Sequence, residues 1–258
     1  MSTTVCVKAI LTSLALAGAL FLGLGSTASA LAQDRGSDMK HRSPTATPEK
    51  QEADNGSDES GFLAVGTQFA DLGSLNDRLE NAGYPTFGSE VFSIGIGGRR
   101  AIGTRWFIGA EVIGMFTPSQ GFEGRDVSLA GFRLVPTLGY TFRPTERLRV
   151  YPEVGIGVEA ALLDIGASGE ASNFGEVLGS PGRSATLARG SLVTRIGAGV
   201  DYKLTGPDGQ ARLGLQAGYA LPALSGDWEL SGGGPTLSGG PDSTLGGFYL
   251  RLLVGDLF

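Results

Sequence analysis

The sequence predicts an all-β protein, a closed antiparallel up-and-down transmembrane β-barrel of about eight strands. Three observations favour this fold. Apolar residues recur with a period of two over most of residues 61–258, as in strands with two unlike faces. Long and short connections alternate strictly between these segments. One face carries the large apolar side chains and almost no charge, whereas the other carries the charges and most of the glycines.

The first segment is typical of an exported protein. Lys8 is the only charged residue among residues 1–32, an apolar run follows from Ala9 to Leu24, and small residues close the segment at Ala28-Ser29-Ala30. A cleaved secretory signal peptide has this order, while a membrane anchor needs a longer unbroken apolar run. We therefore expect residues 1–32 to be a signal peptide, which removes Cys6 and leaves no disulfide chemistry.

Residues 33–60 have a different composition. Large apolar side chains are almost absent, and charged residues, Pro, Ser and Gly dominate. Such a segment buries too little apolar surface to offset its ordering entropy, so we expect a flexible polar linker before a barrel over residues 61–258. The formal net charge of the chain is −6, which argues against a nucleic-acid partner because phosphate binding needs clustered Lys and Arg.

Eight segments alternate clearly enough to be strands that cross a bilayer, which takes about 9 to 11 tilted residues. The clearest is residues 105–117, where Trp106 and Ile108 lie on one face and Phe107 and Glu111 on the other. The predicted strands are residues 61–70, 89–100, 105–117, 127–142, 148–163, 188–204, 211–224 and 244–258.

The connections indicate how the barrel lies in its membrane. Short ones follow the even-numbered segments and long ones follow the odd-numbered segments, as in barrels with periplasmic turns and extracellular loops. A soluble barrel of lipocalin type is the alternative, but it would expose the charge-free apolar face to water. Aromatic residues on that face fall into two groups. Trp106, Phe142, Tyr202 and Phe258 lie at the turn end, and Phe69, Phe92, Phe116, Tyr219 and Phe248 lie toward the loop end.

The first long connection contains a predicted helix from Ser74 to Gly83. Ser74 is a suitable N-cap, Leu75 and Leu79 share one face, and Gly83 followed by Pro85 ends the helix. We expect this helix to form a lid over the mouth of the barrel.

The last segment carries the pattern of an assembly signal. It reads FYLRLLVGDLF, and apolar residues alternate back from a terminal aromatic through Phe258, Val254, Leu252, Leu250 and Phe248. In this, and in its architecture, the chain resembles the small eight-stranded outer-membrane proteins of Gram-negative bacteria, the broad OmpA-barrel, OmpX and OmpW-like group. The resemblance implies an outer-membrane location, contact with outer-membrane lipid and recognition by the barrel-assembly machinery. Asp256 departs from the pattern.

Catalytic and metal-binding residues are scarce in the predicted barrel. The single histidine, His41, lies in the linker, so a hydrolase or acyltransferase that uses a histidine base is not expected. Metal binding by His or Cys is excluded from the barrel for the same reason. We expect no enzyme activity and no cofactor.

The inward face carries a cluster of charges, and we take it as the candidate site. Buried charges must be paired, and eight strands enclose only enough room for side chains, so the cluster predicts a polar plug; a gated pore is the alternative. Arg133 with Glu159, and Asp201 with Arg212, lie at similar heights on neighbouring strands. The cluster comprises Glu111, Arg133, Glu153, Glu159, Arg195, Asp201, Arg212 and Arg251.

The leading functional hypothesis is a non-enzymatic surface barrel whose loops bind an extracellular ligand or support envelope integrity, because loops on a rigid scaffold are where such proteins place function. The alternative is a small porin-like channel for small or apolar solutes. A lipid-modifying enzyme is a third hypothesis.

Overall fold

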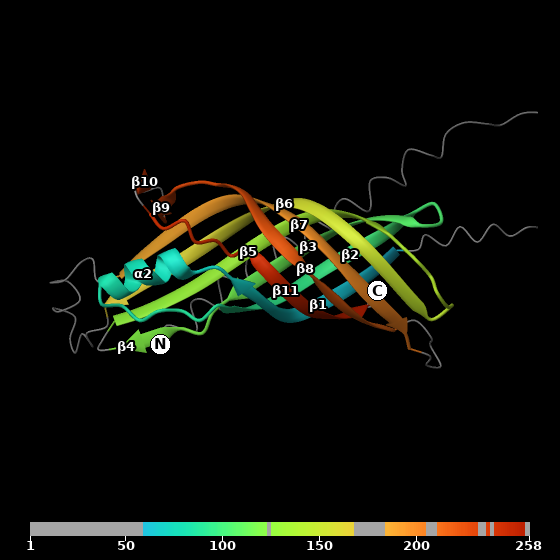
Figure 1. The fold of residues 1–258 in the computed structure, drawn as a ribbon, viewed down its shortest axis with the longest axis horizontal. Coiled ribbons are helices and arrows are strands. Elements are labelled where there is room, and N and C mark those ends of the chain that lie inside the picture. Colours follow the sequence, from blue (N-terminus) through green and yellow to red (C-terminus); the bar gives the residue numbers. More distant parts are fainter. Residues whose placement is uncertain are drawn as a thin grey trace, which may run out of the picture. The chain divides into compact units, whose positions relative to one another are not determined.

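The computed structural model describes residues 59–122, 125–167, 184–204, 211–231, 236–237 and 240–255. Within these residues eight long strands pair antiparallel with their neighbours in chain order (Figure 1). They are β1 (Glu59–Ala70), β2 (Glu90–Ile102), β3 (Trp106–Phe116), β5 (Arg125–Tyr140), β6 (Leu148–Ala167), β7 (Ser184–Lys203), β8 (Arg212–Ser225) and β11 (Gly247–Gly255).

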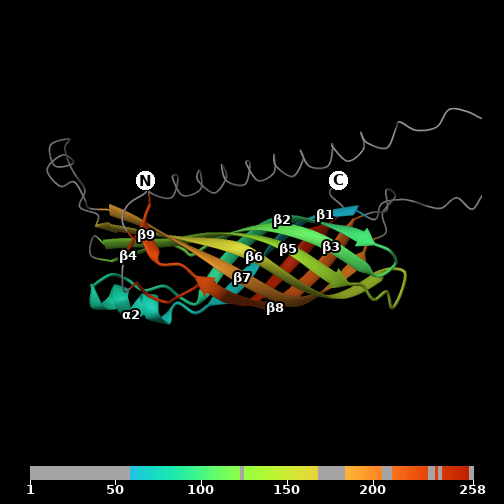
Figure 2. The same ribbon diagram turned by 90° about the horizontal axis from the view of Figure 1, so that it is seen from above.

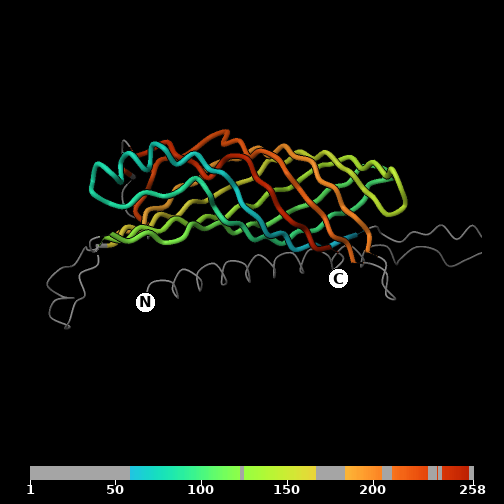
Figure 3. Tube along the Cα trace, turned by 60° about the horizontal axis from the view of Figure 1, so that its bottom comes forward, coloured from blue at the N-terminus to red at the C-terminus, as the bar shows by residue number. Residues whose placement is uncertain are grey.

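The strands close into a ring. The last strand, β11, pairs with β8 on one side and with β1 on the other, where Phe62 lies opposite Gly255 and Ala70 opposite Gly247. Figure 3 shows the strands winding around the barrel with a common tilt. The predicted fold class is therefore confirmed, and each predicted strand is present with shifted ends. The largest shift extends β6 and β7 by four residues at the loop end, to Ala167 and Ser184.

The outer face of the ring is an apolar band. Valine, isoleucine and leucine side chains point outward from every strand of the ring, and Ile156 is 60% exposed. Trp106 and Phe116 lie at the two ends of β3, an 11-residue strand. The ten residue-to-residue steps between them rise about 25 Å along the axis of a barrel with tilted strands, which is the height of a membrane barrel's apolar band.

The described members of both aromatic groups lie outside the barrel. At the loop end the Phe69 and Phe248 rings stack with centroids 6.2 Å apart. At the turn end the ring of Tyr140 lies 5.0 Å from that of Trp106 and 4.9 Å from that of Phe142. Two aromatic belts around an apolar band are what the interfaces of a bilayer select.

Four small elements gather at the loop end of the barrel (Figure 2). They are the helix α2 (Gly73–Asn81) and the short strands β4 (Gln120–Phe122), β9 (Trp228–Leu230) and β10 (Thr236–Leu237). In the described part of the chain no helix is long and apolar enough to cross a membrane.

The helix α2 is present where the sequence predicts it, with Leu75 and Leu79 buried and Gly83 at a φ of 76° after its end. The predicted N-cap is wrong. Ser74 lies inside the helix and the N-cap residue is Leu72, whose side chain makes no capping hydrogen bond. Asp71 Oδ1 accepts from the Gly73 amide at 3.2 Å, and the Ser243 hydroxyl of the last loop accepts from the Leu75 amide at 2.8 Å. The same hydroxyl lies 2.9 Å from that of Ser74. The cap therefore joins two loops that are far apart in sequence.

Several predictions fall outside the described residues. They are the signal peptide, nearly all of the linker, the turn at residues 205–210, and the end of the chain with Asp256 and Phe258. The described chain enters β1 at Glu59, two residues before the predicted start of the barrel.

Candidate functional site

The predicted charge cluster lies along the inside of the barrel. Strand alternation turns these side chains inward, and seven of the eight are buried. The eighth, Arg212, is half-buried at the turn end of β8. The buried charges balance, because four arginines accompany four carboxylates once Arg99 is included. They are Arg99, Arg133, Arg195 and Arg251, with Glu111, Glu153, Glu159 and Asp201.

The layer nearest the loop end is built around Arg133, which is fully buried. Register places it directly opposite Glu159, and its Nε donates to Glu159 Oε2 at 2.8 Å. The other guanidinium nitrogens donate to Gln68 Oε1 and to the Leu245 carbonyl oxygen, each at 3.0 Å. The predicted pairing of Arg133 with Glu159 is present. Gln68 of β1, across the lumen, adds a further hydrogen bond to Arg133.

The central layer joins three strands through Glu111. Its carboxylate accepts hydrogen bonds from Arg195 of β7 and Arg251 of β11. Arg195 also donates to Glu153 at 2.7 Å, and Gln216 donates to the same Glu153 oxygen at 2.6 Å. Removing one partner of such a network leaves a buried charge without compensation, which costs about 3–5 kcal/mol.

The layer nearest the turn end is built around Arg99. Its guanidinium lies 4.2 Å from the centroid of the Tyr151 ring and 4.7 Å from that of Phe62. It also lies 3.4 Å from Asp201 and 3.5 Å from Glu153. Aromatic faces attract a cation, so rings and carboxylates together hold this arginine in place.

Asp201 contacts residues of β6 and β2. The Tyr151 hydroxyl donates to Asp201 at 3.2 Å, and Arg99 donates to it from across the barrel. Register places Asp201 opposite Arg149 of β6 and Gly214 of β8, and Arg212 opposite Lys203; the pairing of Asp201 with Arg212 stays a prediction. Both Asp201 and Arg212 line a hollow at the turn end.

Sequence reasoning missed several residues of this network. Arg99 and Arg100 are consecutive, so composition does not tell which one turns inward, but Arg99 shares the parity of the inward Gly95 and Gly97. The two buried glutamines, Gln68 and Gln216, carry no charge and gave no signal. Only the closed ring brings them beside Arg133 and Glu153.

Glycines on neighbouring strands make room for the largest inward side chains. The Tyr151 ring lies against Gly199, which it faces across the β6–β7 ladder, and the Phe107 ring lies against Gly139 across the β3–β5 ladder. A Cβ atom at either glycine would overlap the ring. The inward glycines therefore set how tightly the lumen packs.

Beyond the Arg133 layer the interior becomes apolar. Aliphatic side chains from the strands, with Phe87 and Leu245 from the connections, pack there against Leu75 and Leu79 of α2 and against Trp228. We call this group the apolar cap. Its buried members are Ala70, Leu72, Leu75, Leu79, Phe87, Val91, Ile113, Met115, Val127, Leu129, Ala161, Leu163, Trp228 and Leu245.

This arrangement has a clear chemical consequence. Each buried carboxylate contacts at least one arginine, and each of the four buried arginines contacts at least one carboxylate. Carboxylates bound in this way are already engaged by guanidinium groups, so they are poorly placed to accept a proton from a substrate. The network favours a structural role over an acid–base role.

Comparison with solved structures finds three similar chains at low sequence identity. The attachment invasion locus protein Ail of Yersinia pestis is 14% identical with a TM-score of 0.41, and the match covers 76% of this chain and 95% of that one. Neisserial surface protein A is 13% identical with a TM-score of 0.42, and the match covers 78% of this chain and 96% of that one. A structure of Ail with the heparin analogue sucrose octasulfate gives 12% identity and a TM-score of 0.42, over 76% of this chain and 95% of that one.

These matches are to small outer-membrane barrels, the group that the sequence was predicted to resemble. The closure of the ring rests on this chain's own strand pairings. No protein-family model matches the sequence, and no curated protein matches it.

Proposed function

We propose that this chain is a non-enzymatic integral outer-membrane barrel with a filled lumen, which presents its loop end at the cell surface. The main observation in support of this proposal is that apolar residues lie on the outside and charged residues on the inside, the reverse of a soluble protein. The exterior is an apolar band between two aromatic belts, and the centre of the interior is a compensated charge network. Lipid is the solvent that such an exterior fits.

The filled lumen favours a closed barrel over a channel. Three layers of paired charges follow one another along the axis, and the apolar cap closes the loop end under α2. Eight strands enclose a lumen only wide enough for side chains, so passage of a solute would require several buried ion pairs to open together. The porin-like channel remains the rival hypothesis.

The membrane partners follow from the same geometry. Outer-membrane lipid covers the apolar band. The barrel-assembly machinery is proposed to read the last strand, where Phe248, Leu250, Leu252 and Val254 all point outward on β11. Phe258 completes that pattern in the sequence.

The charge of the loop end favours a particular kind of surface ligand. Its described residues include nine acidic side chains and only three arginines, Arg78, Arg125 and Arg189. A polysulfated ligand such as the heparin analogue bound by Ail would be repelled here. We therefore propose a cationic extracellular ligand, with envelope integrity as the alternative role. The acidic residues are Asp71, Asp77, Glu80, Glu90, Asp126, Asp164, Asp227, Glu229 and Asp242.

Conductance across a planar bilayer tests the proposal. The refolded chain should insert, migrate faster on SDS gels unheated than boiled, and give no discrete conductance steps. An Arg133→Ala variant should give steps or unstable current, because it removes the centre of one layer. Steady steps from the unchanged protein, altered in Arg133→Ala but not in the exposed Arg78→Ala, would establish the channel instead.

A further inference from the structure

The turn end of the barrel is strongly basic. Apart from the Arg99–Asp201 pair, its described residues include seven basic side chains and two acidic ones, Glu59 and Glu146, and Glu59 pairs with Arg100 at 3.3 Å. The formal net charge of the whole chain is −6, so the charge at this end is opposite in sign to that of the chain. The basic residues are Arg100, Arg105, Arg143, Arg147, Arg149, Lys203 and Arg212.

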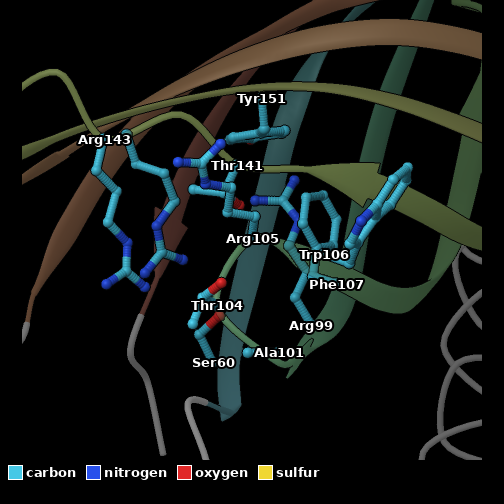
Figure 4. A pocket seen from close by; sticks show the side chains of 11 residues that line it. Ser60, Arg99, Ala101, Thr104, Arg105, Trp106, Phe107, Thr141, Arg143 and Tyr151 are labelled. Atoms are coloured by element: carbon cyan, nitrogen blue, oxygen red, sulfur yellow. The ribbon is translucent and has the colours of Figure 1, made fainter.

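Two adjoining hollows lie among these residues. The smaller, of about 20 Å³, is lined by Arg99, Arg105, Arg143 and Arg149, with hydroxyls from Ser60, Thr104 and Thr141, and no carboxylate lines it. Figure 4 shows Arg143 on one side of it and Trp106 and Phe107 on the other, with Thr104 and Ser60 between them.

The larger hollow, of about 240 Å³, is lined by Arg143, Arg147, Arg149, Lys203 and Arg212. Asp201 and Glu146 also line it, and Asp201 lies opposite Arg149 in the β6–β7 ladder, so five basic side chains face two carboxylates there. Arg143 and Arg149 line both hollows.

The chemistry of this lining matches a phosphate group. Guanidinium groups bind phosphate oxygens through charge-assisted, often bidentate hydrogen bonds, and hydroxyls add neutral donors. The smaller hollow has room for about one water-sized group, whereas the larger one has room for a phosphate and its substituents.

The hollows also lie at the depth where lipid phosphates are found. Trp106 lines the smaller hollow and belongs to the turn-end aromatic belt. Arg105, beside it, donates to the Tyr140 hydroxyl of the same belt at 2.8 Å. Aromatic belts mark the headgroup level of a bilayer, so a headgroup phosphate of the adjacent leaflet lies within reach of Arg105 and Arg143.

We propose that the turn-end hollows form a phosphate-binding site, with Arg143 and Arg149 as its central ligands. The phosphate comes from the headgroup of an anionic phospholipid in the leaflet at the turn end, or from free phosphate. The lipid source rests on the proposed membrane location, whereas the site itself does not.

Isothermal titration of the refolded full chain in uncharged detergent micelles tests the site. The probes are inorganic phosphate and dihexanoyl phosphatidylglycerol, and saturable binding is expected. Arg143→Gln and Arg149→Gln should each weaken binding about tenfold, the loss expected for one charge-assisted hydrogen-bond donor. Arg100→Gln is the matched control, because it removes one positive charge from the same end without lining either hollow.

The outcomes separate the alternatives. Tighter binding of the phosphatidylglycerol identifies a lipid headgroup as the occupant, and binding of phosphate alone identifies a free anion. Equal losses in Arg100→Gln and Arg143→Gln would show a general surface potential and overturn the site, as would absence of saturable binding. Heat-dependent gel migration shows for every variant whether the barrel is folded, independently of phosphate binding. Failure of the site is therefore distinguishable from failure of the proposed function.

Discussion

The two ends of this barrel differ in both packing and charge. At the loop end the interior is an apolar core under a helix, and most of the described charged residues on the surface are acidic. At the turn end the interior is a compensated ion network around Arg99, and the rim is basic. Hydrophobic burial stabilises the ring of strands at one end, and charge pairing stabilises it at the other. Mutations at the two ends should therefore destabilise the protein in different ways.

The largest effect is expected in the central ion layer. Replacing Arg195 by Met leaves Glu111 and Glu153 each short of a partner in a buried setting and should lower the free energy of unfolding by about 3–5 kcal/mol. Urea unfolding of the refolded barrel in detergent micelles measures this. Arg78→Met, at an exposed position on α2, is the control and should stay within about 0.5 kcal/mol of the parent protein. Equal stabilities of the two variants would refute the charge-pairing account.

A smaller and more local effect is expected in the apolar cap. Leu75→Ala should cost about 2–4 kcal/mol, because it opens a cavity in the core beneath α2. The loss should appear as faster proteolysis of the loop end, while the heat-dependent migration of the barrel stays unchanged. Glu80→Ala, on the exposed face of the same helix, should leave proteolysis unaltered. Loss of the whole barrel in Leu75→Ala would show that the two ends do not fail separately.

A third effect concerns the glycine beneath Tyr151. Gly199→Ala places a methyl group where the ring lies and should cost about 1–3 kcal/mol through overpacking of the turn-end layer. Gly190→Ala is the matched control on the same strand, because a Cβ there meets nothing within 4 Å. Urea unfolding should separate the two variants; if both behave alike, the tight packing of Tyr151 on Gly199 does not contribute to stability.

The smallest effect is expected at the cap of α2. Ser243→Ala removes the acceptor for the Leu75 amide and should cost about 1 kcal/mol, the usual value of a lost helix cap. Proteolysis of the loop end reports it, as for Leu75→Ala. Ser74→Ala is the comparison, since that side chain does not cap the helix. A greater loss of protease resistance in Ser74→Ala than in Ser243→Ala would support Ser74 as the N-cap, as predicted from the sequence.

The sequence predicted the ring well because strand alternation and the spacing of connections are local signals. The order of the strands, their outward faces and the Arg133–Glu159 pair all follow from counting residues along neighbouring segments. Contacts across the lumen do not. The meeting of Gln68 with Arg133 depends on closure of the ring, and the capping of α2 by Ser243 depends on two loops that are far apart in sequence.

Short elements were missed for a related reason. The strand β9 pairs with β7 through Leu187 and Ala188, and β4 pairs with β5 through Gln120 and Val127. Three-residue strands have too few positions to show alternation, so tertiary pairing rather than local pattern defines them.

The central claim is that lipid, rather than water, contacts the apolar band, and fluorescence quenching tests it most directly. A single cysteine in place of Ile156, mid-strand on β6, can carry a small fluorophore in a chain whose Cys6 has been changed to Ser. In bilayers, this fluorophore should be quenched by nitroxide-labelled lipid and hardly at all by aqueous iodide. Phe122→Cys, equally exposed but located at the loop end, should show the opposite pattern. Efficient iodide quenching at position 156, without quenching by lipid, would contradict the membrane barrel.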